Sequence, residues 1–133
     1  MGLRTESQFR EPTAIERALL QRLLEAEFPG KRELAALLRN VLVRTIDENG
    51  GLELESQIEG MAPVVKRVPV EAEGKDEDDS IIHMLLHVDG GKPVELEFLR
   101  EDAATVKRLP APSSFELIVL PPMPANGWVS RDS

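Results

Sequence analysis

Residues 81–100 read IIHMLLHVDGGKPVELEFLR, two runs rich in β-forming residues that are joined by a pair of glycines. Side chains alternate between the two faces of a strand, so any pairing of the runs can be tested against the pattern of apolar and polar residues. With Leu86 opposite Leu96 and Met84 opposite Phe98, one face of the pair is continuously apolar. The stretch therefore predicts an antiparallel hairpin at the centre of the fold.

The loop of this hairpin is predicted from the same pattern. Pairing Val88 with Val94 extends the apolar face and requires a three-residue loop over residues 90–92, where glycine adopts left-handed backbone at little cost. A two-residue loop would instead bring Glu95 and Glu97 onto the apolar face. We therefore expect the three-residue loop.

Two helices are expected before the hairpin, because apolar residues recur there at helical spacing. Thr13 and Glu16 form a capping box, so the first helix should run over residues 13–27 with Ile15 in its apolar stripe. A Phe-Pro-Gly sequence should end it. A second, shorter helix should end near Asn40.

From residue 41 onward the apolar pattern alternates, as it does in strands. Besides the hairpin, the expected strands cover residues 41–46, 52–55, 64–73 and 113–120. Pro69 removes a ladder donor, so the strand that contains it should lie at an edge or carry a bulge. A short extended piece is expected at 106–109.

These elements predict an α+β fold in which two N-terminal helices pack on a four- to six-stranded antiparallel sheet. We expect a disordered N-terminus over residues 1–12, a single domain over 13–120 and an irregular C-terminal tail over 121–133. A chain of 133 residues can bury an ordinary core without covalent staples.

Composition narrows the classes of function. The chain has no cysteine, which excludes disulfides and thiolate chemistry, and it has no apolar run of membrane-spanning length. Its net charge is −8; residues 1–44 carry a balance of +2 and residues 45–133 a balance of −10. An acidic surface repels phosphate backbones, so we expect no nucleic-acid partner. Since the chain shows neither a membrane-length run nor a signal-peptide core, we expect no membrane partner and a cytoplasmic protein. A basic protein partner fits this charge better.

Two histidines are the candidate catalytic residues. The predicted register sets His87 opposite Glu95, a possible general acid–base couple, with His83 on the same face as a further candidate. The two rings lie about 13 Å apart by strand rise, too far to share a metal. Since a cross-strand ion pair is the more frequent role of such a couple, we assign no catalytic residue, no metal and no cofactor.

The candidate contacts for a partner are the acidic run Asp76, Glu77, Asp78 and Asp79 and the single tryptophan, Trp128. The acidic run lacks the ligand spacing and glycine of an EF-hand loop, so we expect a solvated hairpin tip. Trp128 could dock on the domain or mark a partner contact.

Several motifs together resemble a family of short bacterial proteins catalogued as a domain of unknown function. The motifs are FPG at residues 28–30, DENGGLEL at 47–54, LHVDGG at 86–91 and ELEFLRED at 95–102, within a likeness that covers 13–109. The resemblance implies a compact α+β domain with two N-terminal helices and an antiparallel sheet. It brings no catalytic residues.

The interpretation that fits these observations best is a non-enzymatic binding protein. It would be an adaptor, or an immunity-like inhibitor of a basic toxin, since the chain is similar to bacterial immunity proteins in size and charge. The alternative is a small hydrolase that uses His87 with Glu95, or His83. A homodimer formed through the sheet would fit either.

Overall fold

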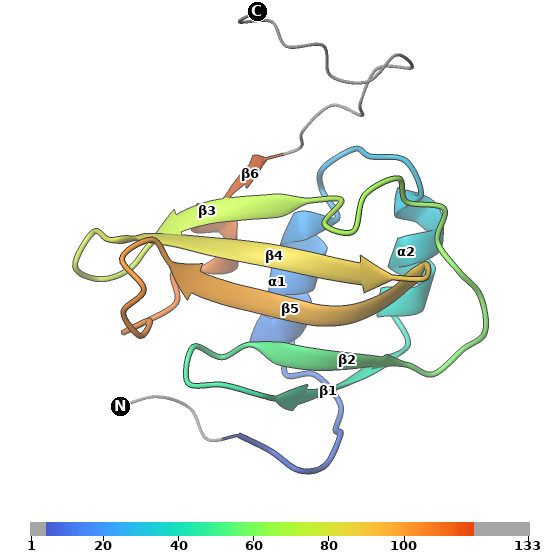
Figure 1. The fold of residues 1–133 in the computed structure, drawn as a ribbon, viewed down its shortest axis with the longest axis horizontal. Helices are drawn as coiled ribbons and strands as arrows, with labels where there is room; N and C mark the ends of the chain where they lie inside the picture. Colours follow the sequence, from blue (N-terminus) through green and yellow to red (C-terminus); the bar gives the residue numbers. More distant parts are fainter. Residues whose placement is uncertain (1–4, 119–133) are drawn as a thin grey trace, which may run out of the picture.

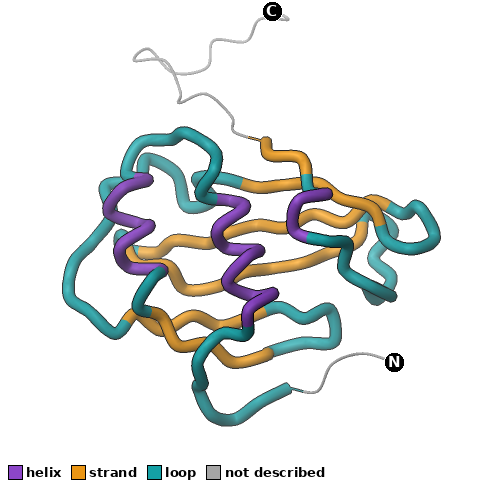
Figure 2. Tube along the Cα trace, turned by 180° about the vertical axis from the view of Figure 1, so that it is seen from behind, coloured by secondary structure: helices purple, strands orange, loops and turns teal. Residues whose placement is uncertain are grey.

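The computed structural model describes residues 5–118 and has two layers. Both helices lie on one face of a six-stranded antiparallel sheet (Figures 1 and 2). The predicted α+β architecture, with the helices N-terminal to the sheet, is confirmed. In the described part of the chain, no helix is both long and apolar enough to cross a membrane.

Helix α1 spans Ala14–Leu23 and begins as the sequence predicts. The backbone N–H of Glu16 donates to the Thr13 hydroxyl, and the Glu16 carboxylate accepts from the Thr13 N–H. The helix ends four residues earlier than expected, in a turn in which the N–H of Ala26 donates to the carbonyl of Leu23. Ile15 was predicted in the apolar stripe, but it is 65% exposed, so that prediction is wrong.

Helix α2 spans Lys31–Leu38, close to its expected end. Its N-cap, Gly30, has a φ of 85°, and a Cβ there would stand 2.8 Å from the backbone of Pro63. The glycine is therefore needed both for the left-handed turn between the helices and for the close approach of the loop that follows the second strand.

The strands are arranged in the order β1-β2-β5-β4-β3-β6, all antiparallel. Their bounds are β1 Val41–Thr45, β2 Leu52–Ser56, β3 Glu71–Lys75, β4 Ile81–Asp89, β5 Lys92–Arg100 and β6 Glu116–Ile118. The predicted hairpin, β4 with β5, is the centre of the sheet. The inward side chains of the hairpin pack with apolar residues of both helices. This core includes Leu19, Leu23, Leu34 and Leu37 from the helices and Ile82, Met84, Leu86, Leu96 and Phe98 from the hairpin.

The register of β4 and β5 agrees with the prediction except next to the loop. Leu86 pairs with Leu96 and Met84 with Phe98, as expected. The loop is the two-residue Gly90-Gly91 turn that we had disfavoured, with φ of 59° and 79°, the backbone of a type I′ turn.

A β-bulge reconciles this short turn with the apolar face. His87 pairs with Glu95, but Val88 pairs with Pro93, so Val94 is the extra residue on β5. Pro93 is buried and Val94 only partly so, which corrects the predicted pairing of Val88 with Val94. The extra residue returns the rest of β5 to the register that keeps the glutamates off the core.

Two other predicted strands differ from the structure. Residues 64–70 form a loop instead of the start of β3, although the carbonyls of Arg67 and Val70 still accept from β4. Pro69 lies in this loop, and β3 lies between β4 and β6 instead of at an edge. In the range predicted as the last strand, η1 covers Pro112–Ser114 and β6 only 116–118, while 119–120 lie outside the described residues.

The segment before α1 covers the free edge of β1. Arg10 exchanges two backbone hydrogen bonds with Val43, and the Glu6 N–H donates to the carbonyl of Thr45. The Arg44 guanidinium lies 4.7 Å from the ring centre of Phe9. We expected residues 1–12 to be disordered; within the described part of that range, these contacts hold the segment against the sheet and protect its edge.

Candidate functional site

The sheet face opposite the helices is the candidate site, because it collects the acidic charge of the β half. Register and burial place eight glutamates on it among the described residues: Glu53, Glu55, Glu71, Glu73, Glu95, Glu97, Glu101 and Glu116. The basic side chains that share this face among the described residues include Arg44, Lys75, Lys92 and the two histidines, and Arg67 lies close enough to Glu95 to act on its pKa. The face is therefore strongly acidic at neutral pH.

The predicted His87–Glu95 pair is found at this face, with a third member. Glu95 is the Cα partner of His87, but the His87 Nε2 atom makes its hydrogen bond to Glu97 Oε1, at 2.8 Å. One donor atom from each of the three residues lies within 4.8 Å of the others. All three side chains are partly buried. Nδ1 of His87 is buried and has no hydrogen-bond partner among residues 5–118.

Glu95 is the member of this cluster whose pKa is shifted from its ordinary value. Burial raises the pKa of Glu95, and the neighbouring carboxylates of Glu97 and Asp47 raise it further. His87 and Arg67 act in the opposite direction without cancelling the effect. Burial is therefore the main reason why the charged form of Glu95 is disfavoured at this site.

His83, which lies four residues before His87 on the same strand, β4, forms a separate cluster. Its Nε2 atom lies 2.8 Å from Glu101, and its Nδ1 atom lies 3.4 Å from Glu71. Each ring nitrogen faces a different carboxylate, so the imidazole is held from both sides. This is the geometry of a structural ion-pair bridge.

The acidic run after β3 has an unexpected role at its first residue. The side chain of Asp76 is fully buried. One carboxylate oxygen accepts the backbone N–H groups of Glu77 and Arg108, and the other accepts the backbone N–H of Lys107 and an N–H of Arg100. Burial acts to raise the pKa of Asp76, but these hydrogen bonds hold it below its ordinary value.

Arg100 is the second centre of this network, although it belongs to the core face of β5. Its guanidinium contacts Asp76, Asp78 and Asp102 and donates to the Ser80 hydroxyl. A hydrogen bond from the Ser80 N–H and the nearby guanidinium lower the pKa of Asp78 to about 2. The network ties the turn between β3 and β4 to the end of β5.

The expected solvated tip is therefore wrong for the first residue of the run. Asp76 is inside the fold, whereas Glu77, Asp78 and Asp79 are exposed, and Asp78 is also engaged with Arg100. Of the predicted partner contacts, Trp128 lies outside the described residues.

Two residues of these sites escaped the sequence analysis. Glu97 lies opposite Leu85 in the paired strands, and its spacing of two from Glu95 puts both carboxylates on one face, which is the signal that could have found it. Arg100 continues the inward series of Leu96 and Phe98, and a charge at such a position is a usable signal of a buried ion pair.

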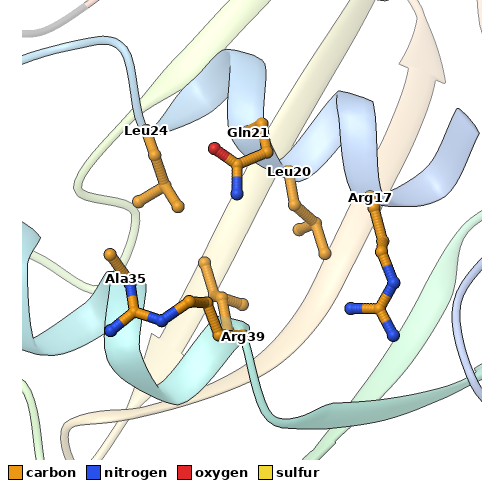
Figure 3. Close-up of a pocket in the computed structure, with 7 residues that line it drawn as sticks. Arg17, Leu20, Gln21, Leu24, Ala35 and Arg39 are labelled. Atoms are coloured by element: carbon orange, nitrogen blue, oxygen red, sulfur yellow. The ribbon is translucent and has the colours of Figure 1, made fainter. Parts of the chain in front are cut away.

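A shallow cleft of about 270 Å³ lies on the helix side (Figure 3). Leu20 of α1 and Leu24, which follows α1, line it together with Ala35 of α2, and Arg17 and Arg39 lie at its two sides. Arg17 is paired with Glu11 at 2.7 Å. No predicted site residue lines this cleft.

Comparisons with known proteins give a family without an assigned function. A search of the curated proteins and a search of the solved structures each found no match. A family model described as "Domain of unknown function (DUF6984)" matches residues 9–110, most of the chain and nearly all of the described fold. The protein therefore belongs to the DUF6984 family.

Proposed function

We propose that this protein is a non-enzymatic binding module whose acidic, helix-free sheet face binds a basic protein. The observation that carries the proposal is the gathering of eight glutamates on one face, against three permanently basic side chains that register places there, Arg44, Lys75 and Lys92, with Arg67 nearby. Such a face favours a positively charged partner and repels acidic competitors.

The size of the face supports this role. Strands spaced by about 4.8 Å make the six-stranded sheet roughly 25 Å wide, and the nine-residue strands β4 and β5 are about 30 Å long. Because the other four strands are only three to five residues long, the strands together cover about 600 Å², the lower end of what each partner contributes to a specific interface. A second copy of this chain is a poorer occupant, because two such faces would repel each other.

We also propose the compartment in which this binding takes place. A chain without cysteine suits a reducing compartment, so we expect a cytoplasmic protein, of bacterial origin by its resemblance. A basic toxin encoded beside this gene would make the immunity-like role the better of the two binding roles.

A fluorescent oligo-arginine peptide can test whether the face itself attracts basic chains. The face variant Glu55→Gln/Glu73→Gln removes two glutamates of this face that lie outside the ion pairs observed within residues 5–118. A matched control, Glu33→Gln/Glu59→Gln, removes the same charge from exposed positions outside the sheet. We expect the face variant to weaken binding at low salt, the control to match the wild type, and binding to fall as salt rises to about 0.15 M.

Equal binding by the face variant and the control would contradict the proposal, because attraction would then depend on net charge alone. The enzymatic alternative has its own test, since His87→Gln would abolish turnover of a chromogenic ester while leaving the fold intact. Such a loss of activity would favour the hydrolase.

A further inference from the structure

His87, Glu95 and Glu97 bring three metal-ligating side chains together on the open face of the sheet. We propose that these three residues bind one divalent transition-metal ion, for which Zn²⁺ is the test case. Their donor atoms lie within 4.8 Å of one another. Bonds of about 2.0–2.2 Å to nitrogen and oxygen place two ligands of one ion at most about 4.4 Å apart, and about 3.4 Å apart in a tetrahedral site, so side-chain movements of about 1–1.5 Å close the site.

The backbone is built to bring these side chains together. The bulge at Val94 puts Glu95 and the residues after it in a register that faces His87. Without the extra residue, the two-residue glycine turn would direct Glu95 and Glu97 toward the core. Bulges that re-aim side chains are frequent beside functional sites, and this one supplies two of the three ligands.

His83 shows what a histidine between two glutamates looks like without such convergence. Its two nitrogens are each engaged, by Glu101 and by Glu71, from opposite sides of the ring. His87 has one hydrogen bond, from Nε2 to Glu97, and its Nδ1 atom is buried without a partner in the described part of the chain. Turning the His87 ring toward an ion therefore costs one hydrogen bond, whereas turning His83 costs two contacts.

The donor set selects the class of ion. One imidazole with two carboxylates suits zinc, manganese, iron or cobalt, while calcium prefers six to eight oxygens and magnesium keeps several waters. A cation also offsets the repulsion between Glu95, Glu97 and nearby Asp47. Three protein ligands on an open face leave a coordination position for water or for a group from a partner. Strand spacing excludes a metal shared by His83 and His87, but it does not show that Glu97 joins His87 and Glu95 at one point.

Isothermal titration of the chelator-treated full chain with Zn²⁺ tests the site directly. We expect one ion per chain for the wild type, and affinity at least about tenfold to a hundredfold weaker for His87→Gln and for Glu97→Gln, by comparison with the loss of an outer-shell partner. The matched control is His83→Gln, which removes the same side chain from the other cluster and should bind Zn²⁺ like the wild type. Circular dichroism of each variant checks that the fold is retained.

Absorption of the Co²⁺-loaded protein gives a second readout that does not depend on affinity alone. Bands of a low-symmetry Co²⁺ site should appear for the wild type and for His83→Gln and be absent for His87→Gln. No saturable Zn²⁺ binding by the wild type, or equal binding by His87→Gln, would overturn the inference. The inference does not rest on the proposed function, because a failure of peptide binding leaves these measurements unchanged.

Discussion

Replacing Asp76 by Asn should destabilise the protein far more than its place in an acidic turn suggests. The carboxylate accepts four hydrogen bonds, two on each oxygen, from Arg100 and from the backbone of Glu77, Lys107 and Arg108. An amide keeps one of these oxygens and turns the other into a donor that faces two donors. Two hydrogen bonds to a charged acceptor are lost, at about 1.5–3 kcal/mol each, so the cost is about 3–6 kcal/mol.

Urea denaturation followed by circular dichroism measures this cost, since a domain of this kind is stable by about 5–15 kcal/mol. Asp79→Asn is the matched control. It makes the same change in the same turn, at an exposed residue with a φ of 69° that Asn adopts as readily as Asp. We expect the control to change the free energy of unfolding by less than about 0.5 kcal/mol.

The pH dependence of this effect has a defined sign. The pKa of Asp76 is lowered in the folded state, so its contribution is complete above the unfolded value of about 3.8 and is lost as the pH falls through the folded value. The difference between wild type and Asp76→Asn should therefore shrink in acid. A difference below about 1 kcal/mol at neutral pH, or a control equally destabilised, would refute the assignment of Asp76 as a buried anchor.

Two further changes test the central hairpin. Gly91→Ala should lower the midpoint of urea denaturation more than Gly90→Ala, because both have positive φ, but a Cβ at Gly91 would stand 2.7 Å from the Cβ of Met61 while the space at Gly90 is open; equal midpoints would contradict this packing. Glu95→Gln, measured with chelator present, should raise the melting temperature at pH 7, because the raised pKa of Glu95 means that its charged form opposes folding. That gain should vanish when the pH falls below the unfolded pKa of Glu95, near its ordinary value of 4.5, and a gain that persists there would point to a packing effect instead of a charge effect.

Much of the fold could be predicted because local patterns and tertiary packing agree. The capping box at Thr13 sets the start of α1, and the alternation of apolar residues fixes which face of β4 and β5 is buried. The end of α1 and the start of β3 could not be predicted in this way. Residues 64–70 are rich in valine, but they pack as a loop with Pro63 against Gly30, a contact between distant segments that local propensity does not encode.

The candidate site also has some features that the local sequence predicts and others that depend on tertiary contacts. The chain itself determines that the β half is acidic and that His87 shares a face with Glu95, since both follow from composition and the two-residue period of a strand. Only the tertiary structure decides that a bulge at Val94 brings Glu97 to the same histidine, because a bulge depends on how the turn and the core are satisfied together. It alone also decides that Asp76 is buried, because its four donors come from segments more than twenty residues away as well as from its neighbour.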